Sequence, residues 1–400
     1  MAFLPSVPDR IQVSTGLFVS AAFTVLYLAL IRVLSERWSP WKVAPLDKGM
    51  LICPIYFILS SCWGVSYSRI GPEEAFRAFA PFLMLGMYLP FRYFLETGLR
   101  ALDLLAACTV SALLTLLYSF TPVFSVAVFR SWLDVRMALE SGAFLPTLPA
   151  AAGISIAAYV TRGVGHRILW LISSLALSFG MIGTVTRSYV GIIAIIVLGG
   201  FCISVLPRFK SHVQTRNIAI IVLLFAVGAF GMNRRYPVVE LILSGMEERA
   251  ESWAGVENRM AEAEAALDVF SQNPLLGGGL GSTIVTYKTG KRRIFEKPFT
   301  HNAVLYILYS GGLVGVCFFA YILLQTALAS RTILRRGSSQ DIRLLLVTLS
   351  GLSGWFIYAL VQASFRSPQS SVTVAALLSI VGSLNAKVLR PKNTSLGLGR

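Results

Sequence analysis

Three side chains suited to phosphate and proton chemistry lie beside apolar segments of the sequence. Arg187 stands in "GTVTRSYVG", Arg259 in "ESWAGVENRMAEAEAALDVF", and His301 begins "HNAVLYILYSGGLVG". The arginine fork is always charged and binds phosphate oxygens bidentately. Imidazole accepts and returns a proton near neutral pH. Together these residues predict displacement of a diphosphate by a hydroxyl, with arginine stabilising the leaving group.

Each of these side chains also has a structural interpretation. Arg187 lies at a boundary between apolar stretches, where an arginine can extend to lipid headgroups. Arg259 can do the same, or pair with Glu262 three residues later. A single histidine at an interface, such as His301, is often structural. The residue types alone leave these alternatives open.

A glycine cluster and a basic run separate Arg259 from His301. The glycines can form a structural turn, or an anion-binding nest in which Gly279 and Gly281 contact a phosphate. The basic run indicates a solvated or headgroup-facing patch. We include Arg293, from this run, and Asn302 among the candidate substrate-binding residues. The glycine cluster is Gly277, Gly278, Gly279 and Gly281, and the basic run is Lys288, Lys291, Arg292, Arg293 and Lys297.

The composition indicates what kind of protein positions these groups. Apolar residues make up 55% of the chain and charged residues 14%, and mean hydropathy is +0.69, values typical of a polytopic membrane protein. Apolar runs long enough to cross about 30 Å of hydrocarbon predict an all-α integral membrane fold with eleven to twelve transmembrane helices. The predicted spans are 13–34, 49–65, 75–91, 101–120, 143–160, 168–185, 189–206, 217–232, 301–326, 344–363 and 370–387.

The Lys and Arg content of the short loops predicts the orientation of the chain. If residues 233–300 lie outside, the inside loops and the C-terminal tail, counted from Lys387, hold eighteen basic residues, whereas the short outside segments hold six. The C-terminus is therefore predicted to be cytoplasmic. The net charge of +16 then reflects topology and contact with anionic membrane lipids, and nucleic acid is not an expected partner.

We predict one membrane domain, residues 1–400, in which 233–300 is a long external loop. An amphipathic helix is predicted at about 253–271, because apolar residues recur there at steps of three and four. Arg259 then borders the buried stripe. The predicted buried stripe is Trp253, Val256, Met260, Ala263, Leu267 and Phe270, and the predicted solvated face is Glu257, Glu264 and Asp268.

No metal site, cofactor or disulfide is predicted. All five cysteines fall within predicted spans, and no Cys/His cluster or carboxylate pair has the spacing of metal ligands. The glycine cluster lacks the preceding strand and the Lys-Ser/Thr pair that a nucleotide phosphate loop requires.

The order of the motifs resembles the O-antigen ligase and polymerase superfamily of bacterial membrane glycosyltransferases. The matching motifs are Thr186-Arg187-Ser188, Arg259, "NPLLGGGLG", His301-Asn302 and "GGLVG" at 311–315. This resemblance implies a GT-C-type membrane fold and a metal-independent, inverting transfer. It implies that Arg187 and Arg259 bind the diphosphate of the donor and that His301 is catalytic.

The resemblance also implies an undecaprenyl-diphosphate-linked glycan as donor, and a location in the bacterial inner membrane with the active site facing the periplasm. Within the superfamily we favour the ligase, which joins O-antigen to the lipid A-core acceptor during lipopolysaccharide biosynthesis. Polymerases tend to have two sizeable external loops, whereas this chain has one. An O-antigen or exopolysaccharide polymerase is the alternative. A lipid-linked glycan flippase would carry charges within several spans, and Arg77 is the clearest such residue.

Overall fold

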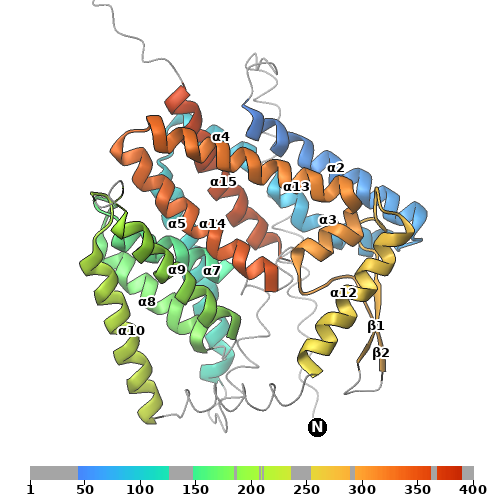
Figure 1. Ribbon diagram of the computed structural model, residues 1–400, viewed down its shortest axis with the longest axis horizontal. Coiled ribbons are helices and arrows are strands. Elements are labelled where there is room, and N and C mark those ends of the chain that lie inside the picture. The colour runs from blue at the N-terminus through green and yellow to red at the C-terminus, as the bar shows by residue number, and fades with distance from the viewer. Residues whose placement is uncertain are drawn as a thin grey trace, which may run out of the picture.

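The computed structural model describes residues 44–125, 147–183, 187–206, 209, 211–235, 254–288, 293–361 and 367–389 (Figure 1). These residues are mostly helical, with one small hairpin. The helices are α2 (Pro45–Tyr67), α3 (Pro72–Leu85), α4 (Tyr88–Thr97), α5 (Ala101–Ser125), α7 (Leu148–Val160), α8 (Arg167–Gly183), α9 (Arg187–Val205), α10 (Thr215–Arg235), α12 (Ala254–Gln272), α13 (Ala303–Arg336), α14 (Ser339–Val361) and α15 (Pro368–Leu389). The strands are β1 (Ile284–Lys288) and β2 (Arg293–Lys297).

The described helices confirm the all-α, polytopic membrane class. Six of them, with α3 and α4 counted as one, are long and apolar enough to cross a membrane, and four shorter apolar helices accompany them. These ten fall where ten of the predicted spans lie. The predicted span 13–34 lies outside the described residues, as does Trp253 of the predicted amphipathic stripe.

The centre of the bundle is formed by α7 packed against α14. Every residue of α7 is buried. The two backbones approach closely because glycines stand at their contact: a Cβ on Gly153 would lie 2.5 Å from the Ser350 carbonyl oxygen, and one on Gly354 would meet the Pro149 carbonyl. Without a hydrophobic driving force between helices in lipid, such small residues supply the packing contact.

One predicted span differs in form from a simple helix. α13 continues ten residues beyond the predicted end at 326, and it is broken at Gly312, whose backbone has φ 62° and ψ −163°. A break leaves carbonyl and amide groups without partners inside the helix, and in a membrane these must be satisfied by other protein groups. The glycine cluster provides them, as described below.

The connecting segments gather at two opposite ends of the bundle. At one end, Thr161 bridges Val213 and the His212 Nδ1 atom lies 3.3 Å from the Ser339 hydroxyl. At the other end, Trp63 donates from its indole nitrogen to the Gly277 carbonyl oxygen at 3.0 Å. The first end therefore joins loops that the charge pattern predicts to be inside, and the second joins segments predicted to be outside.

A hairpin follows the glycine cluster and was not predicted. β1 and β2 pair antiparallel, with Ile284 opposite Lys297 and Lys288 opposite Arg293. Together with α12 it lies at one side of the helical bundle, beside the beginning of α13 (Figure 1). The basic run therefore lies partly on β2. Lys297, the last residue of β2, contacts Glu262 of α12.

Candidate active site

A buried carboxylate on α12 holds the histidine that precedes α13. The Glu262 Oε2 atom lies 2.7 Å from His301 Nδ1, and Oε1 lies 3.0 Å from the same nitrogen. The backbone N–H of His301 also donates to Oε2, at 3.3 Å. Glu262 is only 3% exposed, whereas the His301 side chain is 31% exposed. The imidazole is thus anchored on one edge and accessible elsewhere.

This contact decides how the imidazole can act. An ionised carboxylate only accepts hydrogen bonds, so the proton of a neutral His301 lies on Nδ1 and Nε2 carries the free lone pair. The backbone bond from His301 to the same carboxylate fixes the position of the ring relative to α12. Nε2 is therefore oriented as a proton acceptor, which is the arrangement that a general base requires.

Lys297, at the end of β2, completes the cluster. Its ammonium donates to Glu262 Oε1 at 2.6 Å. Burial raises the pKa of the Glu262 carboxyl, but hydrogen bonds and charge attraction from His301 and Lys297 together outweigh burial and lower the pKa to about 2. Glu262 is therefore ionised across the physiological range. The sequence pattern placed Lys297 in a diffuse surface patch, and the structure pairs it with a buried acid instead.

Arg259 lies one helical turn before Glu262 on α12. It is exposed, and its Nη1 donates to the Val361 carbonyl oxygen at the end of α14, at 3.2 Å. The structural alternative of a pair with Glu262 is realised only as a longer-range attraction between the two charges. A guanidinium has five N–H donors, so the one hydrogen bond that Arg259 makes to the described residues leaves donors for an anion.

Asn302 has a structural role in addition to any contact with substrate. Its side-chain oxygen caps α13 by accepting from the amides of Val304 and Leu305, at 2.8 and 3.1 Å. Its side-chain nitrogen donates to the Leu360 carbonyl oxygen at 3.0 Å. Asn302 directly follows His301 and is thus bonded to the same end of α14 that Arg259 contacts. This helps to bring His301 and Arg259 together.

Arg187 begins α9, and its side chain is not among those described. The start of α9 nevertheless lies beside the end of α14, because the ring of Tyr189 stacks on Tyr358 with centroids 5.4 Å apart. Tyr358 lies one turn before Val361, where Arg259 is bonded. The backbone therefore brings Arg187 to the end of the bundle that holds Arg259 and His301.

The glycine cluster acts as a clamp on the broken helix α13. The amides of Gly278 and Gly279 donate to the carbonyl oxygens of Tyr309 and Ser310, at 2.8 and 2.9 Å. In return the Leu313 amide beyond the break donates to the Pro274 carbonyl oxygen at 2.9 Å. Polar groups on both sides of the break near Gly312 thus gain partners from the loop.

This geometry argues against the predicted contact of Gly279 with a phosphate, whereas that of Gly281 stays a prediction. The Gly279 amide, which an anion-binding nest would need, is already bonded to Ser310. Both glycines have positive φ, 85° and 90°, and a Cβ on Gly281 would lie 3.2 Å from the Ala75 Cα atom. The structural alternative, a tight turn with close backbone contacts, fits these observations. The side chain of Arg293, at the start of β2, is not described.

The predicted orientation of the amphipathic helix is also wrong. α12 covers Ala254–Gln272, but Met260 and Leu267 of the predicted buried stripe are 57% and 46% exposed. The buried face instead contains Glu262 and Ala266, a rotation of roughly a third of a turn at 100° per residue. The reason is that Glu262, an acid, is compensated by Lys297 and His301, which periodicity does not reveal.

Within the described part of the chain, no group of three or more His, Cys, Asp and Glu side chains is arranged to hold a metal ion. Glu262, the carboxylate within the candidate site, already has His301 and Lys297 as partners. The groups offered to a ligand here are the imidazole of His301 and the guanidinium of Arg259. These groups suit a substrate that carries a hydroxyl and an anion.

A comparison with protein families agrees with this chemistry. Residues 172–320 match the O-antigen ligase family. The match confirms the superfamily indicated by the order of the motifs, and it contains Arg187, Arg259 and His301. A search of curated proteins finds no match to the chain. The match supports an O-antigen ligase- or polymerase-like function, and the apolar helices indicate a multi-pass membrane protein.

The matched O-antigen ligase region runs from within α8 into α13, and so includes α12, the glycine cluster and the hairpin. The region does not include α14, yet α14 supplies the carbonyl oxygens of Leu360 and Val361 that hold Asn302 and Arg259. The site is thus completed by a helix outside the O-antigen ligase match.

Proposed function

We propose that the protein is an O-antigen ligase. It transfers a glycan from undecaprenyl diphosphate to the lipid A-core oligosaccharide, at the periplasmic face of the bacterial inner membrane, with a GT-C-type arrangement of its helices. The observation that carries the proposal is the contact of Glu262 with His301 Nδ1. Glu262 lies one helical turn after Arg259 on α12. This contact leaves Nε2 as the proton acceptor beside a cation that suits a diphosphate.

In the proposed reaction a hydroxyl of the acceptor sugar gives its proton to Nε2 of His301. Its oxygen attacks the anomeric carbon of the donor, and the bond from that carbon to the diphosphate oxygen breaks with inversion. The electron pair leaves with undecaprenyl diphosphate, whose negative charge is stabilised by Arg259 and Arg187. Glu262 stabilises the imidazolium and keeps its ring in place.

The test is a reconstitution with the purified protein, lipid-linked O-antigen and lipid A-core. The ligase proposal expects a product in which glycan and lipid A-core are joined. Longer lipid-linked glycans without any joined product would identify a polymerase instead. A protein that only moves the donor across a vesicle membrane, and leaves its diphosphate bond intact, would contradict both transferase assignments.

A further inference from the structure

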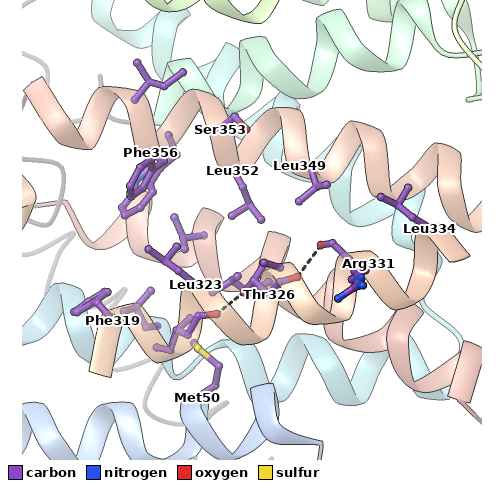
Figure 2. A pocket seen from close by; sticks show the side chains of 18 of the residues that line it. Met50, Phe319, Leu323, Thr326, Arg331, Leu334, Leu349, Leu352, Ser353 and Phe356 are labelled. Atoms are coloured by element: carbon purple, nitrogen blue, oxygen red, sulfur yellow. Dashed lines mark hydrogen bonds between the residues drawn. The ribbon is translucent and has the colours of Figure 1, made fainter. Parts of the chain in front are cut away.

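A second feature of the molecule lies away from His301. A cavity of about 780 Å³ is lined by residues of α2, α3, α13, α14 and α15. Figure 2 shows Arg331 towards one end of this cavity, and Phe319 and Phe356 towards the other. From Phe319 to Arg335 the lining of α13 extends about 24 Å at 1.5 Å per residue, which exceeds one leaflet of hydrocarbon, about 15 Å.

Apart from the hydroxyl of Ser353 on α14, the uncharged polar side chains that line this cavity are already hydrogen-bonded within the protein. Its lining is dominated by Leu, Ile and Phe side chains. The two hydroxyls on its α13 wall are used within the helix: Thr326 donates to the Ile322 carbonyl oxygen at 2.8 Å, and Ser330 to that of Thr326 at 2.7 Å. Such a wall suits a hydrocarbon chain and disfavours a sugar.

Two cations stand at one end of the cavity. Arg331 and Arg335 both line it, one helical turn apart, and both are exposed. Among the described residues neither forms an ion pair. An apolar channel that ends in two free guanidinium groups is complementary to a molecule with one hydrocarbon chain and one anionic head.

The cationic end lies at the membrane face opposite to the candidate active site. α13 begins just after His301 and ends at Arg336. Its last turn adjoins Ser339, which contacts His212 at the end of the bundle that is predicted to be cytoplasmic. A headgroup bound by Arg331 and Arg335 therefore belongs to the other leaflet, and is distinct from the diphosphate assigned to Arg259.

We propose that this cavity binds an anionic glycerophospholipid. Its phosphate contacts Arg331 and Arg335, and one acyl chain lies against Leu323 and Leu352 towards Phe356. Charge selects the occupant, because a zwitterionic headgroup brings its own cation to the two arginines and gains less from them. The site is independent of the transferase function proposed above, since it involves none of the residues assigned to that reaction.

Native mass spectrometry of the purified full-length protein tests this proposal, with phosphatidylglycerol and phosphatidylcholine as the added lipids. The wild type should retain phosphatidylglycerol more strongly. The double variant R331Q/R335Q should weaken that retention by about tenfold or more and leave phosphatidylcholine unchanged. R336Q is the matched control, because Arg336 neighbours Arg335 without lining the cavity, and it should bind like the wild type.

A second variant tests the cavity itself. Leu352→Trp fills it while leaving both arginines in place, and should also reduce phosphatidylglycerol retention. Equal retention by the wild type and R331Q/R335Q would overturn the proposal. So would a co-purified polyprenyl phosphate that Leu352→Trp displaces, or quantitative disulfide cross-linking of Leu352→Cys to a cysteine introduced in 13–34, since that segment would then occupy the cavity.

Discussion

Glu262 and its two partners, which lie 35 and 39 residues later in the sequence, define the chemistry of the site. Glu262 is buried yet ionised because His301 and Lys297 donate to it, at 2.7 and 2.6 Å. Removing one member of a buried pair leaves an uncompensated charge, which typically costs about 3–5 kcal/mol. The trio therefore fixes the geometry of α12 relative to α13, and it also sets which nitrogen of His301 accepts a proton.

A double-mutant cycle separates positioning from catalysis at Glu262. We expect Glu262→Ala to slow transfer because the His301 ring loses its anchor, and Glu262→Gln to slow it less because the amide oxygen can still accept from Nδ1. In a His301→Ala background, Glu262→Ala should cost little more, since residues that act as one unit are not additive. Independent, additive losses in initial rate would contradict the positioning role.

Arg259 and Arg187 are expected to need the guanidinium group and not charge alone. Lysine lacks the bidentate fork, so Arg259→Lys and Arg187→Lys should reduce the initial rate of transfer nearly as much as the alanine variants. Lys291→Ala is the control from the basic run and should be mild. Expression and elution of each variant are compared with the wild type. Near-normal rates for both lysine variants would show that a point charge is sufficient.

At the scale of elements, the break in α13 and the glycine loop form one interlocked unit. Gly312 has φ 62°, and a Cβ at this position would meet the Leu275 carbonyl. Because the loop follows α12 and the break follows His301, this unit connects the two elements that carry Glu262 and His301. The clamp therefore contributes to the alignment of the site without contacting the substrate.

Gly312→Ala should therefore destabilise the protein. A non-glycine residue in such a conformation costs about 1–3 kcal/mol, and the clash with Leu275 adds to this. The matched control is Gly199→Ala in α9, because Gly199 has helical neighbours and nothing within 4 Å of an added Cβ. Thermal unfolding in detergent should show a lower Tm for Gly312→Ala alone. Equal Tm values for the two variants would show that the clamp does not constrain the fold.

The elements also show where sequence reasoning stops. The rare polar types at Arg259 and His301 could be identified, because they border apolar stretches. Glu262 was overlooked as a site residue, since helical periodicity assigns buried positions to apolar residues and its partners lie 35 and 39 residues away. Ala266, four residues after Glu262, is a small residue on the buried face of α12, and its small size could have indicated that face. The glycines indicated a turn, but not that the turn binds α13.

At the scale of the whole molecule, hydropathy predicted the helical membrane class because crossing hydrocarbon imposes one length and one composition on each helix. It did not predict the break at Gly312, because a long apolar run has the same hydropathy whether or not its helix is continuous. The grouping of loops at two ends agrees with the alternation that the charge pattern requires. Which end faces the cytoplasm stays a prediction from the Lys and Arg content.

A reporter that is active only in the periplasm tests this orientation. Fused at residue 400 it should be silent, and inserted at about residue 255 it should be active. The reason is that basic residues concentrate in the loops that lie on the same side of the membrane as the C-terminus. A reporter that is active only in the cytoplasm should give the reverse pattern at the same positions. Activity of the periplasmic reporter at residue 400 would invert the topology and place His301 on the wrong face.

The most direct test of the central claim compares wild type and His301→Ala in the reconstituted transfer of O-antigen to lipid A-core. The assay contains excess EDTA, because arginine and not a metal ion is proposed to stabilise the diphosphate. We expect the wild type to form the joined product under these conditions. Well-folded His301→Ala should be slower by about 10²–10⁴-fold, the usual contribution of a general base. Normal ligation by folded His301→Ala, or a wild type that is inactive until Mg²⁺ or Mn²⁺ is restored, would contradict the account.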